Sequence, residues 1–242
     1  MKPWLQKQWC IPKPSAEFVE RMEDVLEVYK LPYDPIRPVI CLDETNRQII
    51  GETITPIPSK PGSPKKYDYE YVRNGVADIF MMFEPLAACR YIAVTNTRTK
   101  IVFAAYLQDL SDKYYPLAEK IVLVMDNLNT HSLASLCEAF PPAQARRLAE
   151  RFEIHHTPKH ASWLNMAEIE IGIMNRQCLN QRIPSMDMIS FKTGDWVCNR
   201  NSLALTVNWQ FTSEDARIKL KHSYPKYQTL QSTSIFRRYF SQ

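Results

Sequence analysis

The segment IVLVMDNLNTH, residues 121–131, constrains the fold more than any other part of the chain. Five consecutive apolar residues, Ile121 to Met125, are followed at once by Asp126 and by polar side chains up to His131. A run that is apolar at every position predicts a strand with both faces covered. In open α/β sheets, ligands bind beyond the carboxyl ends of the strands. Asp126 is therefore a candidate functional residue at the end of a buried strand.

Apolar runs and helical spacing elsewhere predict a mixed α/β domain. We expect strands at 38–42, 77–86, 89–95, 121–125 and 152–157, the second and third being antiparallel neighbours. We expect helices at 15–30, 97–115, 131–140, 143–152, 164–179, 189–201 and 213–224. Three strands followed by alternating helices and strands favour a sheet of mixed direction flanked by helices.

The composition excludes several classes of protein. No apolar run approaches the ~18 to 20 residues of a membrane-spanning helix, and the N-terminus lacks the apolar stretch of a signal peptide. Six cysteines without a C-x-x-C pair argue against a zinc knuckle and favour a reducing, cytoplasmic location. We expect a proline-rich N-terminal arm over 1–37 with one helix, an α/β domain over 38–225, and a tail of unknown structure over 226–242.

Three acidic residues form a candidate site. Asp43 follows the apolar run VICL as Asp126 follows IVLVM, and Glu168 lies in the first turns of the helix expected over 164–179. A single acid at a strand end is ordinarily a turn or cap residue, and an acid at a helix start interacts favourably with the helix dipole. Two acids that close neighbouring strands, however, repel each other unless a cation lies between them. Carboxylate ligands suit Mg²⁺ or Mn²⁺, and a pair of such ions promotes in-line phosphoryl transfer.

Four segments together resemble one protein family, in their order along the chain. They are CLDETNRQIIGE (41–52), YDYEYVRNG (67–75), VMDNLNTH (124–131) and HTPKHASWLNMAEIEIGIMNRQCL (156–179). These segments are similar to the DDE catalytic domain of bacterial insertion-sequence transposases in the mariner superfamily. The similarity extends from about residue 4 to about residue 225.

The resemblance implies a ribonuclease-H-like fold, the fold shared with retroviral integrases. It identifies Asp43, Asp126 and Glu168 as the catalytic acids that ligate two Mg²⁺ or Mn²⁺ ions. It selects Glu168 over Glu44 and Glu170, between which composition alone does not decide. The family further implies DNA cleavage by water, strand transfer by the freed 3′-hydroxyl, and a homodimer that binds element ends and target DNA. The implied location is the bacterial cytoplasm, in association with the nucleoid.

Polar residues near the three acids are further candidates. Asn127, His131 and Asn165 are expected to line the active site, although a histidine in such a place is as often a satisfied structural residue. Four cationic residues are candidates for DNA contact: Lys65 and Lys66 in SKPGSPKK, and Lys159 and His160 in TPKH. A basic segment such as 59–66 is equally consistent with a solvated loop and with a phosphate contact.

Two alternatives to a working transposase remain. Relatives usually carry a helix-turn-helix region ahead of the catalytic domain, and the expected arm contains no second helix to form one. The chain could therefore be a catalytically inactive or truncated remnant that only binds DNA or dimerises. A small-molecule phosphatase is the weaker alternative, because the chain has five glycines and no glycine-rich loop to hold a phosphate.

Overall fold

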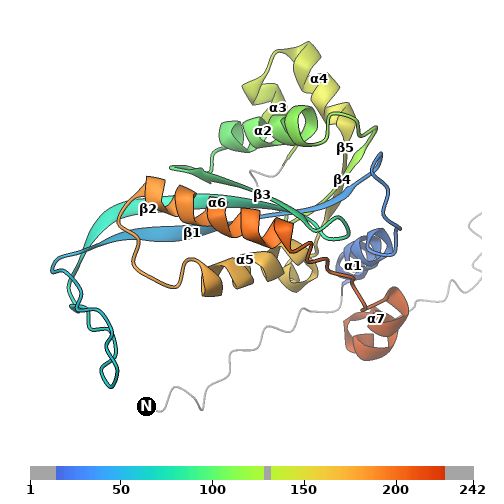
Figure 1. Ribbon diagram of the computed structural model, residues 1–242. Helices are drawn as coiled ribbons and strands as arrows, with labels where there is room; N and C mark the ends of the chain where they lie inside the picture. The colour runs from blue at the N-terminus through green and yellow to red at the C-terminus, as the bar shows by residue number, and fades with distance from the viewer. Residues whose placement is uncertain (1–14, 128–131, 227–242) are drawn as a thin grey trace, which may run out of the picture.

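The structure, a computed structural model, describes residues 15–127 and 132–226. Its strands are β1 Val39–Glu52, β2 Tyr71–Glu84, β3 Cys89–Thr95, β4 Ile121–Met125 and β5 Phe152–His156. Its α-helices are α1 Ala16–Val28, α2 Lys100–Asp109, α3 Ala134–Ala139, α4 Pro142–Arg151, α5 Met166–Gln177, α6 Met186–Ser202 and α7 Ser213–Lys219. The strands form one five-stranded sheet in the order β3-β2-β1-β4-β5 (Figure 1). The first three strands are antiparallel, and β4 and β5 run parallel to β1, which confirms the predicted mixed sheet.

Helices cover both faces of this sheet (Figure 1). α2, α3 and α4 pack on one face, and α1, α5 and α6 pack on the other. Alternate residues of β4 enter the two cores, because successive side chains of a strand point to opposite faces. Leu123 is buried with α2 and α4, while Val122 and Val124 are buried with α1 and α5. The unbroken apolar run of β4 is thus explained by cover on both sides.

α1 belongs to the core, although the sequence suggests an arm outside it. Its buried residues, Phe18, Met22, Val25 and Leu26, recur at helical spacing and pack in the same core as α5. An amphipathic helix with such an apolar stripe gains stability by covering a sheet face, which explains the difference. Residues 1–14 of the expected arm and residues 227–242 of the expected tail lie outside the described residues.

β1 is longer than the sequence predicts. The expected strand ends at residue 42, but β1 continues to Glu52, and β2 begins at Tyr71 instead of residue 77. The residues DETNRQ after the apolar run are polar, so composition does not reveal them as strand. Their antiparallel pairing with β2, for example Asp43 with Met81, holds them extended. Asp43 therefore lies within β1, and it is the neighbouring strand β4 that ends at this level.

β1 and β2 continue beyond the helical layers as a long hairpin. The register shifts at Ile49 and Ile50, opposite Gly75, whose φ of 114° lies in a region that favours glycine. The segment 53–70 extends the hairpin away from α1 (Figure 1). From Asp43 to Glu52 the strand rises over nine residue steps, or roughly 30 Å at the rise of an extended chain.

The remaining elements agree with expectation to within a few residues, apart from the helix expected over 97–115. That helix is observed as α2 followed by a π-helical turn, Leu110–Tyr114. α6 continues through Gly194 without a break. Among the helices of the described segments, none combines the length and apolar character needed to cross a membrane.

Candidate active site

Asp43 and Asp126 lie at the same level on adjacent parallel strands. The register of β1 and β4 pairs Cys41 with Val124, and two residues further along it brings Asp43 level with Asp126. Side chains two residues apart point to the same face of a strand. Cys41 is buried in the core beneath α5, so Asp43 points towards the α5 side of the sheet, where the amide of Asn165 contacts it. Because β4 ends at Met125, the polar groups emerge where the sheet opens.

Asp43 is a buried acid, with 8% of its surface exposed. One carboxyl oxygen accepts the backbone N–H of Glu44 at 2.8 Å, and the other accepts the side-chain amide of Asn165 at 3.2 Å. Burial raises the pKa of Asp43 most, the hydrogen bond from Glu44 lowers it, and the charges of Asp126 and Glu168 raise it further, to about 7. Negative charge therefore accumulates at this point, where a cation would stabilise it.

Glu168 reaches the same place from the first turn of α5. The helix starts at Asn165, whose side-chain oxygen accepts the N–H of Ala167 at 3.1 Å. The amide nitrogen of Asn165 donates to the backbone oxygen of Leu42 at 2.8 Å, as well as to Asp43. One fully buried amide thus ties the start of α5 to β1. The Glu168 side chain is exposed, and its charge, like that of Asp126, contributes to the raised pKa of Asp43, so the three predicted acids lie in one neighbourhood.

The two rival acids are placed differently. Glu170 is completely buried and forms ion pairs with Arg90 at 2.9 Å and with Arg200 at 2.8 Å. Glu44 follows Asp43 on the same strand and points to the opposite face, where Arg98 lies 3.6 Å away. The helical spacing that separates Glu168 from Glu170 therefore directs one to the site and the other into the protein.

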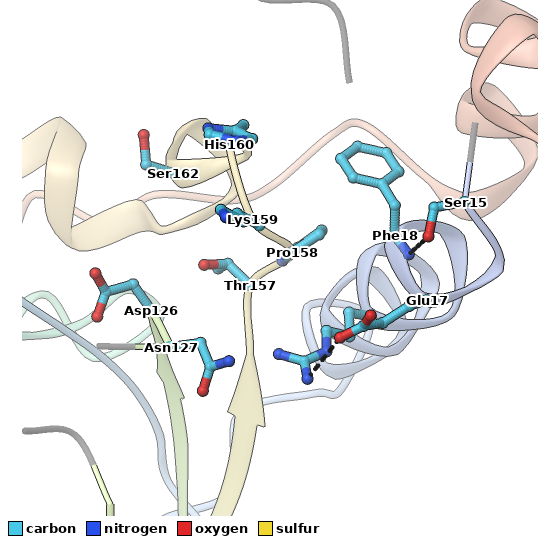
Figure 2. A pocket seen from close by; sticks show the side chains of 11 residues that line it. Ser15, Glu17, Phe18, Asp126, Asn127, Thr157, Pro158, Lys159, His160 and Ser162 are labelled. Atoms are coloured by element: carbon cyan, nitrogen blue, oxygen red, sulfur yellow. Dashed lines mark hydrogen bonds and ion pairs between the residues drawn. The ribbon is translucent and has the colours of Figure 1, made fainter. Parts of the chain in front are cut away.

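A cleft of about 640 Å³ adjoins Asp126. Its lining residues come from the start of α1, the end of β4 and the segment after β5, and they include Asn127, Lys159 and His160. Figure 2 shows Asp126 and Asn127 on one side, the first turns of α1 on the other, and Thr157 to His160 running between them. Of the predicted neighbours, Asn127, Lys159 and His160 are thus beside the site. Lys65 and Lys66 are on the distant hairpin, and His131 lies outside the described residues.

Two backbone contacts hold the end of β4 in place. The N–H of Thr157 donates to the backbone oxygen of Met125 at 2.9 Å. A ring nitrogen of His156 lies 3.1 Å from the backbone oxygen of Asp126. His156 therefore contacts the main chain of a predicted catalytic residue, which supports a structural role for this histidine.

The three carboxylates fit a hard divalent cation by chemistry. Oxygen ligands are those that Mg²⁺ and Mn²⁺ prefer, and such an ion would stabilise the ionised form of Asp43, whose pKa is raised first by burial and then by the neighbouring acids. Within residues 15–127 and 132–226, no three His, Cys, Asp or Glu side chains already form a metal-binding group. Asp126 is half-buried and Glu168 is exposed, so neither side chain is enclosed by packing as Asp43 is.

Sequence reasoning missed the contribution of α1. Ser15, Glu17 and Arg21 line the cleft beside Asp126, although more than 100 residues separate them from it along the chain. The apolar stripe of the helix predicts that it packs somewhere, but no pattern indicates against which strand. Only the observed contact between α1 and β5 explains why its first turns reach the site.

Solved structures of other proteins share the fold of this chain. No curated protein matches the chain. Among solved structures, the fold is similar to the mariner Mos1 paired-end complex with Mg (TM-score 0.58, 14% identity, 91% of this chain and 67% of that one). It is also similar to a pre-cleavage Mos1 transpososome (TM-score 0.55, 13% identity, 92% and 68%). A third similar structure is the Mos1 transposase paired-end complex with the left transposon end (TM-score 0.54, 14% identity, 83% and 61%).

These likenesses confirm the predicted ribonuclease-H-like fold, a mixed sheet flanked by helices. The chain spans about 61 to 68% of the length of these three Mos1 chains. A family model described as DDE superfamily endonuclease matches residues 38–190, which include all three candidate acids. The chain therefore belongs to the DDE superfamily endonucleases.

Proposed function

We propose that the chain is the catalytic domain of a transposase of the mariner type, from a bacterial insertion sequence. It would cut DNA strands by hydrolysis and then join the freed 3′-hydroxyl to target DNA. The observation that supports this proposal is that three acids from distant parts of the sequence lie in one neighbourhood, where the charges of Asp126 and Glu168 contribute to the raised pKa of Asp43. The pairing of β1 with β4 brings Asp43 close to the end of β4, which Asp126 follows, and the Asn165 cap ties the first turn of α5, which contains Glu168, to Asp43.

Asp43, Asp126 and Glu168 would hold divalent metal, with a pair of Mg²⁺ or Mn²⁺ ions expected. Such ions supply Lewis-acid stabilisation of charge on the phosphate and activation of the attacking hydroxyl group. The protein's own contribution is positioning. Asp43 is held by the Asn165 amide, and the half-buried Asp126 is fixed through its backbone at the end of β4. Without a cation, three carboxylates would repel a DNA phosphate.

The catalytic domain is proposed to extend from residue 38 to 225. The family model ends at residue 190, within α6. Beyond it, Trp196 on α6 and Ala216 on α7 are buried in the same core as α5. Their burial supports a domain that continues past the family match.

DNA is the proposed partner, both as element ends and as target. Lys159 and His160, which are exposed beside Asp126, would contact the strand that is cut. Lys65 and Lys66 lie on the hairpin, beyond Glu52, and would contact DNA at a distance from the cut. A homodimer on DNA is proposed because two element ends must be joined; light scattering of the protein–DNA complex would measure its mass.

The proposal is tested by nicking of supercoiled plasmid in the presence of Mn²⁺. We expect wild-type protein to nick the plasmid and Asp126→Asn to lose this activity, because the amide removes one negative ligand with little change in volume. Glu138→Gln is the matched control, since it removes one charge from an exposed pair with Lys100 on the other face of the sheet. An Asp126→Asn protein that nicks like wild type contradicts the assignment. Folded wild-type protein that never nicks supports the inactive remnant instead.

A further inference from the structure

The cleft beside Asp126 has a wall, at the start of α1, that contains none of the three candidate catalytic acids. Its volume of about 640 Å³ corresponds to a cube of about 9 Å on a side. One wall is the start of α1, with Ser15, Glu17, Phe18 and Arg21. The opposite wall carries Asp126 (Figure 2). The cleft therefore leads directly to the site where DNA is proposed to be cut.

α1 is a rigid wall, because it is fixed on several sides. Its apolar face is buried in the core. Asp24 lies 2.7 Å from a ring nitrogen of His155 on β5, and Glu23 forms an ion pair with Arg217 of α7 at 2.7 Å. The hydroxyl of Tyr29, at the end of the helix, donates to the backbone oxygen of Leu164 at 2.6 Å. The cleft is thus a formed feature of the domain.

The rim of the cleft carries positive charge from two elements. Arg21 comes from α1, and Lys159 comes from the segment after β5, where His160 adds a ring that can form a hydrogen bond. Arg21 is paired with Glu17, one turn earlier on the helix, at 3.0 Å. The pair lies at the surface, since 28% of the Arg21 side chain and 72% of the Glu17 side chain are exposed. An anion entering the cleft would compete with Glu17 for the Arg21 guanidinium.

The size of the cleft limits its occupant. A volume of this order is within the roughly 300 to 1,000 Å³ of pockets that enclose a small ligand, and it suits about one or two nucleotides. A duplex is too wide to enter, since its major groove alone is about 12 Å across. Cationic groups beside a narrow groove are the arrangement by which proteins bind a single strand.

We propose that this cleft receives an unpaired end of the DNA strand next to the phosphate that is cut, with Arg21 contacting its backbone and Glu17 opposing that contact. The inference rests on the proposed function and adds a substrate preference to it: DNA that is frayed at the cleavage site binds more tightly than fully paired DNA. α1 is then a substrate-binding element of the domain as well as a part of its core.

The test measures binding by fluorescence anisotropy in Ca²⁺, an oxygen-binding cation that would neutralise the three carboxylates in place of Mg²⁺, and gel analysis verifies that the probe stays uncut. The probes are a fully paired duplex and the same duplex with a short unpaired tail. We expect wild type to prefer the tailed duplex and Arg21→Ala to lose about five- to tenfold in affinity for it, with less than about twofold change for the paired duplex. Its salt dependence for the tail should fall by the equivalent of about one phosphate contact. Glu17→Gln should strengthen tail binding by about two- to threefold, because it frees Arg21 from a competing anion.

The opposite signs separate DNA binding from helix stability. Both changes break the same ion pair, so a merely structural role would move both variants in one direction. Arg146→Ala is the matched control, since Arg146 forms an exposed pair with Glu150 at the same spacing on α4, on the other face of the sheet. Thermal melting verifies that each variant is folded. In addition, a photoreactive thiothymidine in the tail should cross-link to peptides that contain 15–21 or 157–162.

Three results would overturn the inference. They are equal affinity of wild type for tailed and paired DNA, equal losses for both probes in Arg21→Ala, and a shift of Arg21→Ala and Glu17→Gln in the same direction. None of these depends on catalysis. Plasmid nicking with Mn²⁺ reports on the proposed function separately, so either proposal can fail while the other stands.

Discussion

Two buried carboxylates of this domain, Glu170 and Asp43, are held in opposite ways. Glu170 is completely buried and is paired with two arginines, Arg90 and Arg200. Burial raises its pKa, but the hydrogen bonds from the two guanidinium groups outweigh burial, and the net pKa is lowered. Asp43 is almost as buried, yet its neighbours are other acids, and its pKa is raised to about 7. The protein supplies the counter-charge in one place and omits it in the other.

The difference separates a structural ion pair from a site for an external cation. Glu170 links three elements, because Arg90 lies on β3 and Arg200 on α6 while Glu170 itself lies on α5. Arg90 also donates to the backbone oxygens of Ala88 at 2.8 Å and Leu205 at 2.6 Å. The negative charge of Glu170 is thus matched by positive charge inside the protein. Asp43 retains a need for positive charge, which is what a metal-binding carboxylate requires.

The largest effect on stability is expected at Glu170, the carboxylate that is paired inside the protein. Glu170→Gln leaves two buried guanidinium groups without their anion, and such a break typically costs about 3 to 5 kcal/mol in the free energy of unfolding. Urea denaturation at neutral pH measures it. Glu138→Gln, in the exposed pair with Lys100, should cost no more than about 1 kcal/mol. A Glu170→Gln protein as stable as wild type would show that the buried network does not hold the sheet to its helices.

Asp43→Asn is expected to raise the free energy of unfolding of the metal-free protein, whereas Glu170→Gln lowers it. Because the folded-state pKa of Asp43 is about 7, above the ordinary value of 3.8, ionisation of Asp43 penalises the folded state at alkaline pH. The amide cannot ionise, so Asp43→Asn should be more stable than wild type at pH 8 by roughly 2 to 4 kcal/mol. The gain should shrink as the pH falls through about 7 and should vanish below the unfolded pKa near 4. Urea denaturation in EDTA across this range gives the difference directly.

Metal should reduce the stability difference between the two proteins. A cation bound by folded protein at a hundredfold excess over its Kd stabilises it by about 2.7 kcal/mol. Mn²⁺ should therefore raise the melting temperature of wild type at pH 8 and leave Asp43→Asn nearly unchanged. If the two proteins instead have the same stability in EDTA at pH 8, burial and the neighbouring acids do not penalise ionised Asp43, and its pKa is not raised.

Sequence patterns predict the parts of this domain that local physics determines. β4 is found where its apolar run predicts, because both of its faces are covered. Helical spacing predicts that Glu168 and Glu170 face different sides of α5, and the resemblance identifies Glu168 as the residue at the active site. The extension of β1 past Asp43 could not be read in this way, since the polar residues there are held extended by pairing with β2, far along the chain. The position of α1 beside Asp126 likewise depends on tertiary contacts alone.

The smallest effect on stability is expected from the hydrogen bond between Asn165 and Asp43, which is weaker than the hydrogen bonds of Glu170. Glu170 accepts charged donors, whereas the donor side chain that contacts Asp43 through Oδ2 is the neutral amide of Asn165. Asn165→Ser keeps a residue that can cap α5 but removes the amide bonds to Leu42 and Asp43. The loss in stability should be about 1 to 2 kcal/mol, measured by urea denaturation in EDTA. Asn46→Ser, the same change at an exposed position of β1, should have almost no effect.

Stability alone would not show that Asn165 positions the acids, because any buried hydrogen bond contributes to it. Mn²⁺ affinity, measured by titration calorimetry without DNA, tests positioning directly. If Asn165 holds Asp43 and the start of α5 in mutual register, Asn165→Ser should bind Mn²⁺ several-fold more weakly even where both proteins are folded. Unchanged affinity in that variant would mean that β1 and α5 align their acids through packing, and that the Asn165 amide serves the fold only. The contrast with Glu170 would then lie in charge and not in the way each carboxylate is held.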